Sequence, residues 1–404
     1  MNEIRVLLDD ERIGELVFDD KKREYAFNYI KQSAPISLTM PYKKSSYLWQ
    51  HSLHPIFEMN LPEGYLFEVF KNHLSKEYGY INDFLVFSYL SPNIESRLTF
   101  ESEFDKRLFD GVDIDEILNN DSEDTFLKLL RIFLDKNAIS GIQPKTLALI
   151  KDKESLSLKE YIVKTWGEEY PYLAENEYFC MKAVQYAGVN VADTQLSKNK
   201  KFLLVEKFNY DKKNGKYLGF EEVLVLLGKN RDKKYSGSYE QIAKTIYAVA
   251  TDKETSMRAL YKTIVMSYLL KNGDAHLKNF GVLYDGEFKN IYFAPAYDIV
   301  NTTAYIFKDK PALTMFGKKL WFGKNELIKF GTNHCYLSLS SATLLYGECK
   351  SALLKIMEEL EKYMIENPLF KDIGIKMIES WKLSLTEKSY KEIPDEVIRH
   401  WTKS

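Results

Sequence analysis

The stretch "NGDAHLKNFG", residues 272–281, decides how the rest of the chain is interpreted. An acid, an imidazole, an ammonium group and an amide follow one another closely in it, at Asp274, His276, Lys278 and Asn279. The apolar pattern before this stretch predicts a helix with one buried face. Gly273 is the expected point at which the chain leaves that helix. We therefore expect a polar loop held by a rigid element.

The spacing inside this loop indicates phosphoryl transfer. Asp274 and Asn279 match the D-x-x-x-x-N spacing of the protein-kinase catalytic loop. That chemistry needs a carboxylate that accepts the proton of an attacking hydroxyl, and an amide oxygen that binds Mg²⁺ without adding charge. Asp298, which follows the apolar run 291–294, is the expected second metal ligand. Asp and Asn are also common turn and capping residues after a helix, and His276 could simply orient a neighbour or pack.

Other segments fit a nucleotide site. Lys164 ends the alternating run "EYIVK", so it should point to one face of a sheet, as the phosphate-pairing lysine of V-A-I-K does. Glu175 or Glu177, on the helix that follows, could pair with Lys164 or remain solvated. In "LLVEKF", Glu206 and Phe208 are expected to lie beside the adenine of a bound nucleotide, although Phe208 could equally be a residue of the hydrophobic core. The loop "AISGIQPKT" has one glycine and fits neither G-x-G-x-x-G nor Walker A.

Composition limits the possible classes of protein. The 404 residues exceed one ordinary core, and a net charge of −2 argues against a polybasic surface for nucleic acid or membrane. Three scattered cysteines form no CxxC pair, so we expect small core residues rather than a zinc site or a disulfide framework. The N-terminal region has no sustained apolar run, so no signal peptide or membrane span is predicted and a cytoplasmic location is expected.

The pattern of apolar residues changes along the chain. Residues 1–100 contain the strand-like runs "IRVLLDD", "RIGELVFDD" and "EYAFNYI", with a helical patch at Gly64–Leu74. Residues 139–208 read as strands around one helix, "ENEYFCMKAVQYAG". Long helical patterns, among them "MRALYKTIVMSYLLKNG" and "ALLKIMEELEKYMIEN", dominate after residue 240. An α+β protein with a mostly helical second part is therefore predicted.

Seven segments taken in order resemble the HipA family of serine/threonine kinases, the toxins of bacterial type II toxin–antitoxin pairs. They are "SGIQPKTLALI", "YIVKTW", "ENEYFCMKAVQYAGV", "LLVEKFNYD", "SGSYEQIAKTI", "NGDAHLKNFGVLYD" and "PAYDIVN". Residues 1–105 also resemble the N-terminal subdomain of that family. The resemblance implies a two-lobed, protein-kinase-like α+β fold with an N-terminal subdomain (1–110), a kinase N-lobe (111–245) and a helical C-lobe (246–404).

The resemblance also implies a function and its partners. ATP and Mg²⁺ are the expected cofactors, and the substrate would be a protein, which in known members is an aminoacyl-tRNA synthetase. Phosphorylation of that substrate starves translation, so the expected role is a growth-inhibiting toxin. Family members bind a dimeric helix-turn-helix antitoxin, so DNA would be reached only through that partner.

The roles of site residues are carried over position by position. Asp274 becomes the catalytic base, and Asn279 and Asp298 become the magnesium ligands. The implied ATP-binding residues are Lys164, Ser140, Gly141, Gln143, Lys145, Glu206, Phe208, His276 and Lys278. Family members can autophosphorylate a loop serine, but Ala138 stands at the better-known position, so Ser140 is the remaining candidate. Ser140 could instead bond phosphate or its own loop.

Two alternative functions remain open at this point. A small-molecule kinase of the aminoglycoside or choline type has H-G-D-x-x-x-x-N, whereas Asn272 replaces that histidine here, and such enzymes have no place for the N-terminal module. A pseudokinase that only holds a DNA-binding partner is the second alternative. The presence of Lys164, Asp274, Asn279 and Asp298 argues against it, because a scaffold has no physical need for all four groups.

Overall fold

The computed structural model describes residues 3–104, 114–122, 124–126, 128–129, 154–157, 161–167 and 169–401. The chain forms two compact units and passes between them more than once. The first unit consists of residues 1–170, 196–233 and 284–288, and the second of residues 171–195, 234–283 and 289–404. The three-segment division inferred from the sequence stays a prediction.

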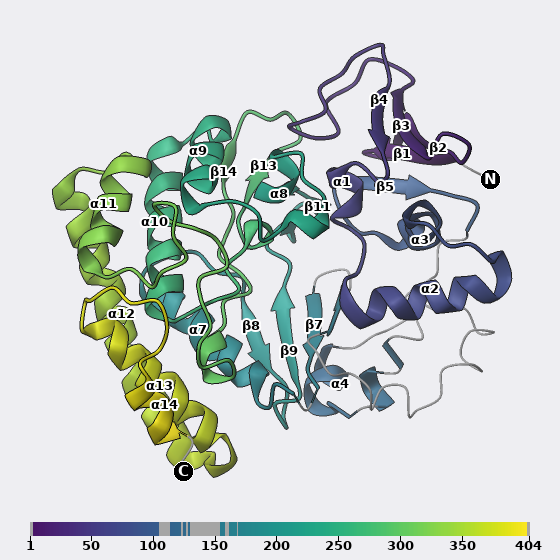
Figure 1. Cartoon of the computed structure of the whole chain (residues 1–404). Helices are drawn as coiled ribbons and strands as arrows, with labels where there is room; N and C mark the ends of the chain where they lie inside the picture. The colour runs from purple at the N-terminus through teal and green to yellow at the C-terminus, as the bar shows by residue number, and fades with distance from the viewer. Residues whose placement is uncertain are drawn as a thin grey trace. The chain divides into compact units, whose positions relative to one another are not determined.

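The first unit begins with a five-stranded antiparallel sheet of order β4-β3-β2-β1-β5 (Figure 1). Its strands are β1 (Glu3–Leu8), β2 (Glu11–Asp19), β3 (Glu24–Tyr29), β4 (Tyr47–Gln50) and β5 (Leu98–Glu101). Three helices accompany the sheet: α1 (Pro55–Glu58), α2 (Gly64–Tyr78) and α3 (Asp83–Leu90). Phe57 of α1 contacts Phe87 of α3 and Phe100 of β5. The predicted strands and the helical patch at 64–74 are confirmed.

A second sheet extends the same core. Its order is β6-β7-β9-β8, and β7 pairs antiparallel with both β6 and β9. Val163 on β7 and Leu204 on β9 are fully buried and belong to the hydrophobic cluster of the N-terminal sheet. The remaining elements of this part of the chain are α4 (Ile114–Asn119), β6 (Glu154–Ser157), β7 (Tyr161–Thr165), β8 (Thr194–Leu196), β9 (Phe202–Glu206), β10 (Tyr210–Asp211), β11 (Lys216–Tyr217), β12 (Gly219–Glu222) and α8 (Val223–Leu226).

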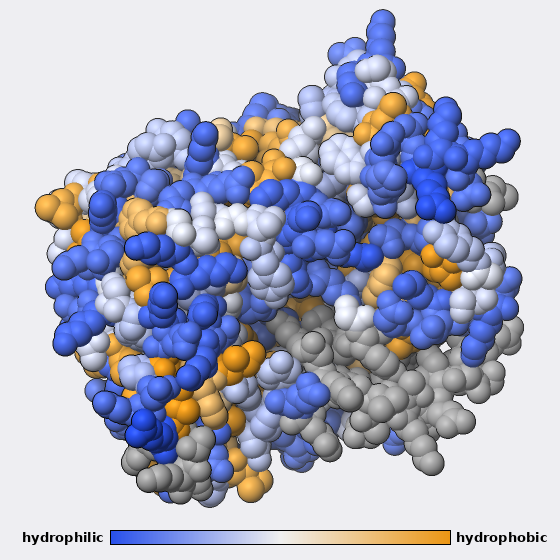
Figure 2. All heavy atoms as spheres, viewed as in Figure 1, coloured by the Kyte–Doolittle hydropathy of each residue, from blue (hydrophilic) through white to orange (hydrophobic). Residues whose placement is uncertain are grey.

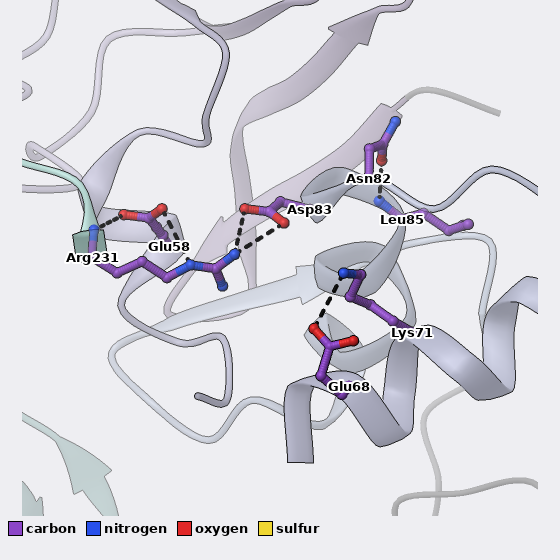
Figure 3. Close-up of polar contacts among 7 residues, drawn as sticks. All are labelled: Glu58, Glu68, Lys71, Asn82, Asp83, Leu85 and Arg231. Carbon is purple, nitrogen blue, oxygen red and sulfur yellow. Dashed lines mark hydrogen bonds and ion pairs between the residues drawn. The ribbon is translucent and has the colours of Figure 1, made fainter. Parts of the chain in front are cut away.

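Arg231 ties the 196–233 segment to the N-terminal helices (Figure 3). Its backbone N–H donates to Glu58 Oε2 at 2.8 Å, and its Nη2 donates to both carboxylate oxygens of Asp83 at 3.2 and 3.1 Å. The guanidinium carbon also lies 4.2 Å from the centroid of the Phe67 ring. One arginine therefore connects the ends of α1 and α3 with a segment far away in the sequence.

Stability should fall as the pH rises through the titration range of Glu58. Burial raises the pKa of this carboxyl from 4.5 to about 7, although the N–H and the charge of Arg231 act in the opposite direction. Between these two values the folded chain holds a proton that the unfolded chain has lost. The free energy of unfolding should therefore decrease by up to about 3 kcal/mol across this window. Urea unfolding at pH 5 and pH 8 measures the decrease.

Glu58→Gln should remove most of this decrease, because the amide still accepts the Arg231 N–H and has no proton to lose. The matched control is Glu68→Gln, since Glu68 is exposed and pairs with Lys71 at 3.2 Å (Figure 3). An equal pH slope in wild type and in Glu58→Gln would contradict this account.

The second unit is mostly helical (Figure 1). Helix α10 contacts α7, α9, α12 and α13, and its side chains Leu260 and Ile264 are fully buried. The helices are α7 (Leu173–Tyr186), α9 (Tyr239–Val249), α10 (Lys253–Leu269), α11 (Lys324–His334), α12 (Leu339–Glu366), α13 (Lys371–Leu385) and α14 (Asp395–Trp401). Short strands β13 (Gly281–Tyr284) and β14 (Ile291–Phe293) precede the segment that carries Asp298. The helices predicted around residues 257–273 and 352–367 are confirmed as parts of α10 and α12.

One predicted helix boundary is wrong. α10 ends at Leu269, not at Gly273, and the residue that adopts the left-handed conformation after it is Lys271, with a φ of 59°. Gly273 is required for space, because a Cβ there would overlap the carboxylate of Asp309. The glycine therefore marks a close approach of two segments rather than a change of chain direction.

The burial of the cysteines and the hydrophilic surface agree with what the composition predicts. Cys180, Cys335 and Cys349 are all buried free thiols, as predicted for core residues. Hydrophilic side chains predominate on the face drawn in Figure 2, and the apolar ones form small groups. Among the helices that the structure describes, none combines the length and the apolar character that crossing a membrane would require.

Candidate active site

The polar loop starts from a helix end that side chains of α13 hold in place. A helix leaves its last carbonyl groups without partners inside the helix. Here the Leu269 carbonyl accepts from Ser384 Oγ at 2.9 Å, and the Leu270 carbonyl accepts from the indole N–H of Trp381 at 3.0 Å. Trp381 is fully buried. The start of the loop is therefore fixed by two hydrogen bonds from a packed helix.

Short hydrogen bonds then set the course of the loop itself. The Asp274 N–H donates to Asn272 Oδ1 at 3.1 Å, and the His276 N–H donates to the Asp274 carbonyl at 2.8 Å. The Asn279 N–H donates to the His276 carbonyl at 3.0 Å, in the short 3₁₀ turn Leu277–Asn279. These bonds fold the loop so that Asp274 and Asn279 belong to one compact, hydrogen-bonded segment.

Asn279 brings the loop to Asp298. Its Nδ2 donates to Asp298 Oδ2 at 3.1 Å and to the Asp298 carbonyl at 3.3 Å. Asp298 adopts a φ of 59°, a left-handed conformation that is uncommon for a residue other than glycine. Such local strain persists where surrounding contacts fix the backbone, and it is frequent at functional sites. The two hydrogen bonds that Asp298 accepts from Asn279 Nδ2 provide such contacts here.

A buried pair of asparagines fixes the chain after Asp298. The Asn301 N–H donates to Asn176 Oδ1 at 2.8 Å, and Asn176 Nδ2 donates back to the Asn301 carbonyl at 3.0 Å. Asn301 Nδ2 also donates to Ser380 Oγ on α13 at 2.7 Å. Both asparagines are fully buried. Helices α7 and α13 therefore hold the segment that presents Asp298.

The residues beside Asp298 fit a magnesium ion. Asn279 Oδ1 is buried and has no hydrogen-bond partner among the described residues, which is costly unless a ligand satisfies it. Together with the carboxylate of Asp298, it offers two hard oxygen ligands. No group of three His, Cys, Asp or Glu side chains suited to a metal occurs among the residues that the structure describes. Mg²⁺ does not need such a group, because it usually keeps waters and uses phosphate oxygens alongside one or two protein ligands.

Asp274 presents its carboxylate at a partly exposed position, with 43% of the side chain accessible. Its Oδ1 accepts a hydrogen bond from the Tyr235 hydroxyl at 2.7 Å and lies 3.9 Å from Nε2 of the buried His276. This placement suits His276 as an orienting neighbour. The Lys278 carbonyl accepts from the Tyr297 hydroxyl at 2.5 Å. The ATP-binding roles of His276 and Lys278 stay predictions.

Lys164 lies in the first unit, on β7. It is buried, with 6% of its surface exposed, and it pairs in register with Leu203 of β9. Because side chains alternate along a strand, Lys164 faces away from the core side that Val163 occupies. Glu175 and Glu177 are buried on α7, so the alternative that they are solvated is wrong. Their pairing with Lys164 stays a prediction.

The structure describes only some of the other residues predicted for the nucleotide site. Glu206 forms an ion pair with Lys212 at 3.0 Å, and the half-buried ring of Phe208 packs edge-on against Phe220, with 5.2 Å between centroids. The predicted phosphate loop lies outside the described residues, and with it Ala138, Ser140, Gly141, Gln143 and Lys145.

The second unit thus holds Asp274, His276, Lys278, Asn279 and Asp298 in one hydrogen-bonded site, whereas Lys164, Glu206 and Phe208 belong to the first unit. The sequence did not identify the residues that position this site. They are Asn176, Tyr235, Asn301, Thr302 and Trp381. Asn301 lies within the segment "PAYDIVN", yet nothing in its spacing indicates a partner more than a hundred residues away.

Comparison with known proteins identifies the family. A family model described as the HipA-like C-terminal domain matches residues 137–364, which is more than half of the chain. This chain belongs to the HipA family. A second model, the HipA N-terminal domain, matches residues 4–92.

The relatives of this HipA-family chain include proteins named as kinases. A Haemophilus influenzae protein named "Putative kinase" is 34% identical over 186 residues, which cover 42% of this chain and 53% of the relative. A similarly named protein of Sinorhizobium fredii is 24% identical over 204 residues, which cover 45% and 49% of the two chains. The chain spans about half the length of the curated relatives it matches.

A solved structure supports the fold. A chain of the Shewanella oneidensis MR-1 toxin–antitoxin complex of HipA, HipB and its operator DNA matches with a TM-score of 0.71 and 17% identity. The match covers 95% of this chain and 97% of that one. The predicted HipA-like α+β fold, with an N-terminal mixed α/β part and a mostly helical C-terminal part, is confirmed.

Proposed function

We propose that this chain is an ATP- and Mg²⁺-dependent serine/threonine protein kinase that acts as a growth-inhibiting toxin. The observation that carries the proposal is the arrangement around Asn279: its buried amide oxygen lacks a partner among the described residues, its Nδ2 binds Asp298, and the same loop presents Asp274. Membership of the HipA family and relatives named as kinases support the same reading.

Each of these side chains has a task in the proposed reaction. Asp274 accepts the proton of the acceptor hydroxyl as that oxygen attacks the γ-phosphorus of ATP, and ADP leaves. Asn279 Oδ1 and the carboxylate of Asp298 would hold Mg²⁺, which when bound neutralises charge on the phosphates. Lys164 pairs with phosphate oxygens, and Glu206 and Phe208 bind the adenine. Ser140, Gly141, Gln143 and Lys145 form the proposed phosphate loop.

The proposed biological partners follow from the family. The substrate would be an aminoacyl-tRNA synthetase in the cytoplasm, and a helix-turn-helix antitoxin would neutralise the kinase and connect it to DNA. The matched Shewanella structure is a complex of HipA with HipB and its operator DNA. Ser140 is the proposed site of self-phosphorylation.

Brief expression followed by phosphoproteomics tests the function. Wild type and Asp274→Ala should be compared in the same host. In parallel, each purified protein should be assayed with γ-phosphate-labelled ATP, with and without chelation of Mg²⁺. We expect new phosphoserine or phosphothreonine sites and Mg²⁺-dependent label transfer with the wild type alone. Equal phosphorylation by wild type and Asp274→Ala would refute the role of Asp274, and no label transfer by the wild type would refute the kinase.

A further inference from the structure

A short segment, Lys234–Tyr239, lies along the candidate catalytic loop, and we call it the strap. The Lys234 carbonyl accepts from the Leu277 N–H at 3.1 Å, and the hydroxyl of the fully buried Tyr239 donates to the Ala275 carbonyl at 3.1 Å. A Cβ at Gly237 would lie 3.3 Å from a methyl group of Leu277, so the two segments pack closely there. The strap is therefore fixed to the loop by contacts that do not involve the side chain of Tyr235.

Tyr235 projects from this strap onto the carboxylate of Asp274. Its hydroxyl donates to Oδ1 at 2.7 Å, and its ring packs edge-on against His276 with 5.1 Å between centroids. The side chain is not buried, since the residue is 47% exposed. Burial therefore does not explain its position. The hydrogen bond to Asp274 and the ring contact with His276 instead fix the orientation of the Tyr235 side chain.

The two oxygens of Asp274 have different surroundings. Oδ1 has the Tyr235 hydroxyl and His276 Nε2 beside it. Within the part of the chain that the structure describes, no hydrogen-bond donor contacts Oδ2. A phenolic hydroxyl donates to one oxygen and leaves the other oxygen of a carboxylate available as an acceptor. A base held in this way presents one defined oxygen to the incoming hydroxyl.

We propose that Tyr235 is a positioning residue that holds Asp274 by Oδ1 so that Oδ2 receives the proton of the acceptor hydroxyl. The proposal rests on the proposed kinase function. Orientation of a catalytic group has a large effect on rate, and a misplacement of about 1 Å can cost roughly a hundredfold. Tyr235 acts through Asp274 and does not itself touch the nucleotide.

The test combines Tyr235→Phe with Asp274→Asn in a cycle of the full-length protein. Label transfer from γ-phosphate-labelled ATP to dephosphorylated casein and the release of ADP give kcat and KM. Tyr235→Phe should lower kcat by roughly 10- to 100-fold, with the KM for ATP within about twofold of wild type. In the Asp274→Asn background the same change should have no further effect, because the base that Tyr235 orients is already lost. A merely structural role would lower kcat in both backgrounds.

Tyr336→Phe is the matched control, since Tyr336 is also an exposed tyrosine of the second unit and its ring contacts Tyr247. An active wild type with unchanged kcat in Tyr235→Phe would overturn the positioning role alone. Mass spectrometry that finds phosphate on Tyr235 of the wild type would also overturn it, because the hydroxyl would then be the acceptor. A wild type that transfers no label in any assay would count against the kinase function as well.

Discussion

Asp274→Asn is expected to lower kcat for phosphoryl transfer by about 10²–10⁴-fold, which is the range that a general base contributes. The amide has nearly the same shape and can still accept the hydrogen bond from Tyr235, but it cannot take the proton of the acceptor hydroxyl. The side chain is partly exposed and lies outside the core, so folding should be unaffected. Steady-state label transfer and calorimetric titration with Mg²⁺ and ATP measure the two properties separately.

Asn279→Ala provides the contrast to that variant. It removes the amide oxygen that we assign to the metal and leaves the base in place. Its activity should therefore recover partly as the Mg²⁺ concentration rises, whereas that of Asp274→Asn should not. If Asp274→Asn retained more than about a tenth of the wild-type kcat, Asp274 would be a capping residue of the loop rather than the base.

The sequence predicted the elements of the site better than the contacts that position them. Spacing alone placed Asp274 and Asn279 on one loop after a helix, because the D-x-x-x-x-N pattern is local and its geometry depends on a single turn. The strand that carries Lys164 was equally clear, since alternation of side chains is also a local property.

Long-range contacts left no comparable signal. Asn176 and Asn301 satisfy each other's amides across the fold, and Trp381 donates to the carbonyl at the end of α10. A buried asparagine or tryptophan looks the same in sequence whether its partner is near or far. Gly273 was misread for a related reason: its role is to avoid Asp309, which a helix-ending pattern does not indicate.

Trp381→Ala is expected to destabilise the protein by about 3–5 kcal/mol, which is typical for removal of a buried tryptophan. The side chain is fully buried, and its loss would leave both a cavity and an unpaired carbonyl at Leu270. Because this carbonyl lies directly before the catalytic loop, the loop should also lose its anchor. Urea unfolding measures the change in the free energy of unfolding. The kcat measured at urea concentrations well below the unfolding transition, where the protein is still folded, shows whether the loop has lost its position.

Ser384→Ala separates the hydrogen bond from the packing. It removes the bond to the Leu269 carbonyl with almost no change of volume, so we expect a loss of only about 1 kcal/mol. The destabilisation by Trp381→Phe should lie between those of Trp381→Ala and Ser384→Ala, since this variant keeps an aromatic ring but not the indole N–H. If Trp381→Ala unfolded no more readily than Ser384→Ala, the packing of the Trp381 indole would not support the loop.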